Sequence, residues 1–217
     1  MRDVLDTASQ LIKDQAGKIT SSQASVSLIR DTTDDNIFPT KGSKSTVSVA
    51  FTGGPLQGDE QFIRYGLVSS KFFPMPLDTV FAVRGQVGYI QGNNDVKEVP
   101  IYERYYLGGI GSLRGLRDVG PKDPITNDPL GGFTMMCFTA EFVFPLIKNA
   151  GIKGVIFYDT GNAWDSGYHF DDLRQTAGIG VRWYSPIGPL RLEWGYVLDR
   201  KFDEPASRWE FTIGMFM

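Results

Sequence analysis

One glycine-rich loop, residues 105–118, carries the residues whose types and spacing could do chemistry. Its centre is the segment Leu113-Arg114-Gly115-Leu116. Glycines let the backbone turn back on itself without a steric penalty, while the leucines and tyrosines of the loop are too apolar to remain in water. We therefore expect the loop to fold inward and to carry Arg114 to a partner. The alternative is a surface loop with a solvated arginine.

Three other features contain residue types used in catalysis or metal binding. Asp159-Thr160-Gly161 matches the triplet of aspartic proteases, but the sequence has no second copy. Gly108-Gly109-Ile110-Gly111-Ser112 lacks the lysine that follows in a phosphate-binding loop. His169 is the only histidine, which argues against a histidine metal site or a catalytic triad. We therefore expect no catalytic residue, no metal and no cofactor, with an aspartic protease as the alternative from another functional class.

The composition indicates one folded domain. The chain has 217 residues, 41% of them hydrophobic, and a net charge of −3, which argues against nucleic acid as a partner. A single cysteine, Cys137, excludes an internal disulfide framework. No apolar run approaches the roughly 20 residues of a spanning helix, and the first residues do not read as a signal peptide. We interpret the chain as either cytosolic or part of something larger.

The spacing of apolar residues changes near residue 22. Helical spacing predicts a short amphipathic helix over residues 4–16, within an N-terminal segment 1–22. From residue 23 the apolar period is two, which is typical of β-strands. The alternating segments are residues 23–29, 45–51, 63–68, 81–89, 135–144, 156–159, 176–183, 190–196 and 208–217. The sequence therefore predicts an all-β antiparallel meander of about nine strands.

The connections between these strands alternate in length. Short turns with proline lie at residues 38–42, 73–77, 144–151 and 185–189, and longer polar loops lie at residues 52–60, 91–131, 164–173 and 199–207. Short turns at one rim and long loops at the other are typical of an outer-membrane β-barrel. Such barrels have an even number of strands, so we interpret residues 23–217 as the C-terminal part of a larger barrel, with 91–131 as a long inward loop.

The placement of charge favours a membrane barrel over a soluble β-sandwich. One face of each strand is apolar, and the other carries charged residues and glycines. The charged members are Arg84, Glu141, Asp159, Arg174, Arg182, Arg191, Glu193 and Glu210, and the glycines are Gly88, Gly178, Gly180, Gly195 and Gly214. Charge belongs in the lumen of a membrane barrel, and glycine there leaves room for an inserted loop. A soluble sandwich would instead pack the apolar faces inward.

Several motifs together resemble one known family. The segment Leu113-Arg114-Gly115-Leu116, which follows Tyr106-Leu107-Gly108-Gly109, resembles the Val-Arg-Gly-Phe loop motif of the BamA/TamA/two-partner-secretion barrel superfamily. Further matching segments, in the family's order, are Phe38-Pro39-Thr40 with Gly42-Ser43, Glu141-Phe142, Asp159-Thr160-Gly161 with Trp164-Asp165, and Ser185-Pro186 with Gly188-Pro189-Leu190. The resemblance runs from residue 23 to the end. Leu116 departs from the family's phenylalanine, and Met217 departs from a terminal aromatic.

The resemblance implies a fold and a set of site residues. It implies a transmembrane 16-stranded β-barrel whose sixth extracellular loop tucks into the lumen. The loop-lumen motif would be Leu113, Arg114, Gly115 and Leu116, with Glu141 and Asp159 as the lumen partners of the arginine. The lateral seam and C-terminal recognition strand would comprise Trp209, Phe211, Ile213, Gly214, Met215 and Met217.

The resemblance also implies a function and partners. The expected function is the assembly and insertion of β-barrel proteins into the bacterial outer membrane, without enzymatic activity. The expected partners are outer-membrane lipid, unfolded β-barrel client proteins and accessory lipoproteins that bind through upstream domains. The alternative within the same superfamily is a translocation pore of the two-partner-secretion or TamA type.

Overall fold

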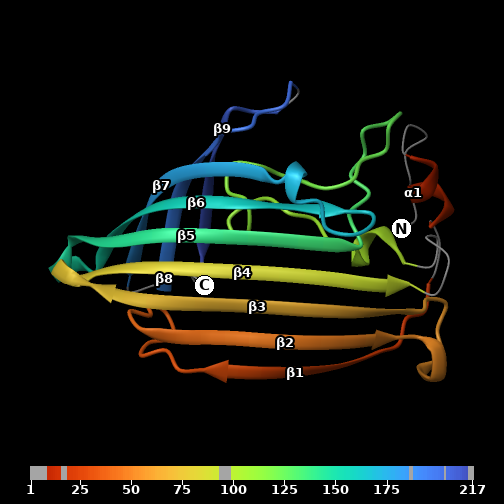
Figure 1. Ribbon diagram of the computed structural model, residues 1–217, viewed down its shortest axis with the longest axis horizontal. Coiled ribbons are helices and arrows are strands. Elements are labelled where there is room, and N and C mark those ends of the chain that lie inside the picture. Colours follow the sequence, from red (N-terminus) through yellow and green to blue (C-terminus); the bar gives the residue numbers. More distant parts are fainter. Residues whose placement is uncertain (1–8, 16–18, 93–98, 186–187, 203, 215–217) are drawn as a thin grey trace.

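The chain forms one antiparallel sheet of nine strands in sequence order (Figure 1). The computed structural model describes residues 9–15, 19–92, 99–185, 188–202 and 204–214. The strands are β1 (Gln23–Asp31), β2 (Gly42–Thr52), β3 (Phe62–Met75), β4 (Thr79–Gly92), β5 (Thr134–Ile147), β6 (Ile152–Trp164), β7 (Arg174–Ser185), β8 (Gly188–Val197) and β9 (Ser207–Ile213). Each strand pairs with its sequence neighbour, so the predicted meander is confirmed.

The two faces of the sheet have opposite chemistry. On β7 and β8 the apolar side chains of Ile179 and Leu192 are 55% and 45% exposed. On the inner face, Glu141 and Glu193 are 1% and 0% exposed. In the described residues there is a single sheet, so no second sheet covers the apolar face. This is the inverted arrangement expected of a barrel wall that faces lipid, and it differs from a soluble sandwich.

In the described part of the chain, the helix covers less than the predicted range. Within the described residues, α1 spans Gln10–Asp14, whereas the apolar spacing predicts residues 4–16. Ser9 has non-helical dihedral angles (φ −57°, ψ 150°), and its hydroxyl accepts a hydrogen bond from the amide of Ile12. A serine that caps the first turn in this way marks the start of the helix, so α1 begins at Gln10. Residues 4–8 and 16 lie outside the described part of the chain.

The remaining helical elements are short. They are the 3₁₀ turns η1 (Gly54–Leu56), η2 (Pro76–Asp78), η4 (Ile101–Glu103), η5 (Lys148–Ala150) and η6 (Phe170–Asp172). None of the helices in the described ranges combines the length and the apolar character needed to cross a membrane.

Two predicted turns are wrong in detail. The strands β3 and β5 continue through Pro74 and Pro145, which the sequence places in turns. Pro145 lies at a shift in register, where a strand tolerates the missing N–H. Within the described residues, strand β9 ends at Ile213, and Gly214 adopts φ +132°, which a glycine tolerates. Met215 and Met217 lie outside the described residues.

The long loop between β4 and β5 folds into the hollow of the sheet. Isolated bridges join Tyr105 to Gly132 and Leu107 to Val119, so the loop has a defined shape. It packs through an apolar cluster that also includes wall residues: Leu107, Leu113, Leu116, Val119, Cys137 and Val197. The apolar residues of the described part of the loop therefore pack against the wall, which is the direction that the sequence predicts.

The outward face generates a stability prediction. Replacing Ile179 with arginine in the full barrel should lower the free energy of unfolding in lipid vesicles by about 2 to 4 kcal/mol, because a cation on the lipid face must enter hydrocarbon. Ile125, which is 92% exposed in the long loop, provides the matched control. Ile125→Arg should change the free energy by no more than about 0.5 kcal/mol. Equal effects of the two substitutions would contradict a lipid-facing sheet.

Candidate functional site

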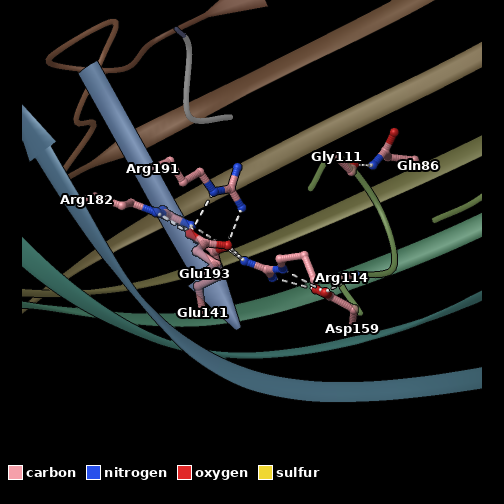
Figure 2. A network of polar contacts seen from close by, with 8 residues as sticks. All are labelled: Gln86, Gly111, Arg114, Glu141, Asp159, Arg182, Arg191 and Glu193. Atoms are coloured by element: carbon pink, nitrogen blue, oxygen red, sulfur yellow. Dashed lines mark hydrogen bonds and ion pairs between the residues drawn. The ribbon is translucent and has the colours of Figure 1, made fainter. Parts of the chain in front are cut away.

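Arg114 is buried in the lumen and contacts three carboxylates. Its Nε and Nη2 atoms donate to the two carboxylate oxygens of Asp159 at 2.7 and 2.6 Å. Its Nη1 atom donates to Glu141 Oε1 and Glu193 Oε2, both at 2.7 Å. The backbone amide of Arg114 also donates to Asp159, at 3.2 Å. Figure 2 shows these contacts, which bring strands β5, β6 and β8 to one point of the loop.

Two further arginines complete the set. Arg182 Nη1 and Nη2 donate to Glu141 at 2.9 and 2.7 Å, and its Nε atom donates to Glu193 at 2.9 Å. Arg191 Nε donates to the same oxygen of Glu193 at 2.6 Å. We call Arg114, Glu141, Asp159, Arg182, Arg191 and Glu193 the ion cluster. Its formal charges cancel, and Glu193 lies between two arginines that face each other across β7 and β8.

Burial decides what the ion cluster does for stability. The side chains of its six members are at most 6% exposed, although the described sheet is open at both edges. Removing charges from water costs several kcal/mol per ion, so a buried cluster adds little net stability. Losing one member, however, leaves an uncompensated charge and costs about 3 to 5 kcal/mol. The cluster therefore fixes the position of the loop more than it stabilises the sheet.

Two glycines let the loop approach the wall. Gly115, in the loop, has φ +94°, and a Cβ atom there would lie 2.7 Å from the carbonyl oxygen of Gly195. A Cβ atom on Gly195, in β8, would lie 2.4 Å from the carbonyl oxygen of Arg114. Both distances are too short for real contacts. The glycine of the motif and the glycine of the strand are therefore needed together, since the two backbones touch.

Apolar and aromatic contacts surround the charged atoms. The Arg114 guanidinium lies over the ring of Phe157 at 3.4 Å from its centroid, a cation–π contact. Leu113 and Leu116 are 0% and 1% exposed in the apolar cluster of the loop. The family has phenylalanine at the position of Leu116, and in this chain the leucine packs in the same apolar cluster. Gln86 Nε2, on β4, donates to the carbonyl of Gly111 at 3.0 Å and holds the loop tip (Figure 2).

A second ion pair lies at the rim of the long loops. Arg174 is 4% exposed and donates to Asp199 at 2.6 Å and to Glu204 at 2.8 Å. The hydrogen bond from Arg174 lowers the pKa of Glu204. Because the two acids lie in the loop between β8 and β9, this pair holds that loop against the start of β7.

The structure brings together some of the predicted site residues. Glu141 and Asp159 meet Arg114, but Glu193 also does, and the sequence had placed Glu193 only on the lumen face. The sequence did carry a signal that Glu193 pairs with other arginines, because the pairing of β7 with β8 sets Arg182 opposite Arg191. Like charges directly opposite on neighbouring strands are destabilising, so an acid between them is required.

The predicted seam residues lie apart from the ion cluster. Trp209, Phe211 and Ile213, on β9, are 63%, 62% and 57% exposed and make none of the cluster's contacts. The amide of Gly214 donates to the carbonyl of Pro189 at 2.9 Å, which extends the pairing with β8 by one bond.

The residues considered for catalysis or metal binding have other contacts. Asp159, in the protease-like triplet, is engaged by Arg114. His169 Nε2 lies 2.9 Å from the carbonyl oxygen of Ser166. Across the part of the chain that the structure describes, no group of His, Cys, Asp and Glu side chains has a metal-binding arrangement.

The ion cluster predicts a large effect of Arg114→Ala. In the full protein this substitution should lower the free energy of unfolding by about 3 to 5 kcal/mol, because three buried acids lose a shared cation. Heat-modifiable gel mobility and denaturant titration measure the effect. Arg117→Ala removes an exposed arginine of the same loop and is the control, with little expected change. An unaltered unfolding transition in Arg114→Ala would count against the cluster.

The backbone contact predicts a steric effect of Gly195→Ala. The added methyl group should push the loop from the wall and weaken the Arg114 contacts, although no charge is changed. Limited proteolysis of the loop in the full protein should therefore accelerate. Gly111→Ala adds the same methyl group where nothing lies within 4 Å, so its proteolysis should match that of the unsubstituted protein. Similar rates in the two variants would show that the close approach is unimportant.

Comparisons with known proteins agree with this geometry. The family model of the Omp85 superfamily domain matches residues 2–217. The outer membrane protein assembly factor BamA of Nitratidesulfovibrio vulgaris is 36% identical over 99% of this chain and 28% of that protein. The assembly factor BamA of Neisseria meningitidis is 29% identical over 85% of this chain and 27% of that protein. The chain therefore spans less than a third of these curated relatives.

A solved structure supports the same relationship. The crystal structure of BamA from Haemophilus ducreyi lacking POTRA domains 1–3 matches with a TM-score of 0.77 and 25% identity, over 89% of this chain and 42% of that chain. The motifs of the loop and of strands β5 and β6 predicted the BamA/TamA/two-partner-secretion barrel superfamily, and BamA within it, and these likenesses confirm that prediction. The chain belongs to the Omp85 superfamily.

Proposed function

We propose that this chain is the C-terminal part of a barrel that assembles and inserts β-barrel proteins into the bacterial outer membrane. Its membership of the Omp85 superfamily supports this, as do relatives that are named outer membrane protein assembly factors. The proposal places the exposed apolar face of the sheet against outer-membrane lipid. It involves no enzymatic step, and it takes unfolded β-barrel proteins as clients and accessory lipoproteins as partners of upstream domains.

The observation that carries the proposal is the state of β9. In the described residues β9 is the shortest strand, with seven residues paired to β8, and in the full barrel its other edge would face the first strand. An edge strand offers a row of backbone donors and acceptors to any strand that approaches. Lipid cannot satisfy these groups, so a client strand that pairs with β9 gains hydrogen bonds that the membrane does not supply.

The contacts of β8 and β9 support a seam that opens at this strand. The ion cluster draws on β5, β6, β7 and β8, but not on β9. Glu210 of β9 faces Glu193 across the pair, and like charges opposite each other weaken a strand pair. Glu210 is 9% exposed, and its Oε1 atom has no hydrogen-bond partner among the described residues. In this proposal strands β5 to β8 keep their pairing, and β9 is the strand that separates from its partner.

A disulfide across the seam tests the proposal. A cysteine at Thr212 and one at the facing position of the first strand of the full barrel should block client insertion when oxidised, since β9 can no longer exchange partners. Insertion of a folded barrel client into liposomes that contain the full protein is the measurement. Reduction should restore insertion. A variant that carries only one of the two added cysteines should behave as the unsubstituted protein. Full insertion through the oxidised seam would refute the proposal.

The same liposomes distinguish assembly from export. A barrel client and a secreted passenger chain are offered separately to the full protein. Assembly predicts that the barrel client becomes protected in the membrane while the passenger remains outside. Transport of the passenger without insertion of the barrel client would favour the translocation pore.

A further inference from the structure

The turn between β1 and β2 contains a motif, Phe38-Pro39-Thr40, that the proposed function leaves without a role. This turn lies at the short-turn rim, at the left of Figure 1. Phe38 and Pro39 are half-buried, and they line a small cavity of 30 Å³ inside the sheet. Its other walls include Phe72, Val80, Ala82, Lys153, Glu141 and Arg182. Glu141 and Arg182, two members of the ion cluster, thus line the same cavity as the turn.

The polar residues of the turn hold it in one shape. Asp34 accepts hydrogen bonds from the amide of Thr40 at 2.8 Å, from the hydroxyl of Thr40 at 2.5 Å and from the amide of Lys41 at 3.1 Å. Asp35 accepts from the amides of Ile37 and Phe38, both at 2.7 Å. These bonds pair the amides on both sides of Pro39 with acids of the same turn. The turn is therefore preformed, and it presents Phe38 without help from a partner.

The end of the turn requires glycine. Gly42 has φ +97°, and a Cβ atom there would lie 2.2 Å from the carbonyl oxygen of Thr32. Any other residue would separate the two ends of the turn. The geometry of the turn thus explains why residue 42 is glycine. The hydrogen bonds above likewise explain Thr40, Asp34 and Asp35.

The register of the sheet places the turn level with the ion cluster. Gly42 pairs with Phe72, Phe72 with Ala82, and Ala82 with Glu141, so these residues form one row across β2, β3, β4 and β5. Phe72, Ala82 and Glu141 are buried on the inner face. Phe72, Val80 and Ala82 form an apolar cluster that lines the same cavity as the turn and the charged residues. The Lys153 ammonium, on β6, lies 4.5 Å from the centroid of the Phe38 ring, which ties the turn to the opposite wall.

We propose that Phe38 is a positioning residue that covers the ion cluster from the short-turn rim. The apolar cluster around Leu113 and Leu116 covers the same charges from the loop side. A cation and its acids interact strongly only while water and salt stay away, so both covers are needed to hold Arg114 in place. The cavity that remains has room for about two water molecules and not for bulk solvent. This inference deepens the proposed function, because it names what keeps the loop seated.

The test uses Cys137, which is 1% exposed beneath the loop in contact with its apolar cluster. In the full protein, with any other cysteine replaced by serine, the rate of labelling by a charged thiol reagent reports release of the loop. Phe38→Ala should label several-fold faster at about 1 M salt, where the Debye length is about 3 Å, than at about 0.1 M. The unsubstituted protein should show no dependence on salt, because its charges are covered.

Two matched variants separate the cover from a general loss of stability. Leu77→Ala removes an 85% exposed apolar side chain from the next short turn, and its labelling should remain independent of salt. Phe38→Leu keeps an apolar cover and should restore most of the protection. Salt-independent labelling in Phe38→Ala, or equal salt dependence in Leu77→Ala, would overturn the inference. Since labelling needs no client protein, failure of the proposed assembly function would leave this result unaffected.

Discussion

The structure depends on one constraint, which is that a guanidinium group buried in the lumen must meet enough negative charge. Arg114 satisfies it with Asp159, Glu141 and Glu193, each at 2.7 Å or closer. These acids come from three strands, so the loop can reach them only if the strands keep their register. The loop must also approach to backbone contact, which the glycine pair at positions 115 and 195 permits. Charge, register and close approach therefore support one another.

The ion cluster divides the sheet into parts with different roles. Strands β5 to β8 are cross-linked by buried charges, whereas β9 contributes none of them. Cross-linking by charge costs desolvation and adds little net stability, but the loss of one member leaves an uncompensated buried charge. A wall of this kind can remain in place while the neighbouring strand changes partners. The proposed assembly function therefore depends on two features of the cluster: it connects β5 to β8, and it does not extend to β9.

Much of this could be predicted from the sequence because a strand has a simple period. Alternation placed Glu141 and Asp159 on the same face, and the apolar residues of the loop indicated its inward course. The contact between Arg114 and Glu193 could not be predicted in the same way, since it depends on how deeply the loop enters. Strand ends were also less certain, because the sequence alone did not show that β3 continues through Pro74. The sequence also did not show that the turn around Phe38 lies level with the ion cluster. That position depends on the register of four strands, and the alternation within one strand does not reveal it.

The central claim is that Arg114 and its acids act as one buried unit. A double-mutant cycle of Arg114→Ala and Asp159→Ala in the full protein, measured by unfolding in lipid vesicles, tests it most directly. The account predicts strong non-additivity, with a coupling energy in the upper part of the range of about 0.5 to 3 kcal/mol for contacting residues. Each single variant would then cost almost as much as the double variant. Additive effects would contradict the account, because they would show that the arginine and the aspartate stabilise the protein independently.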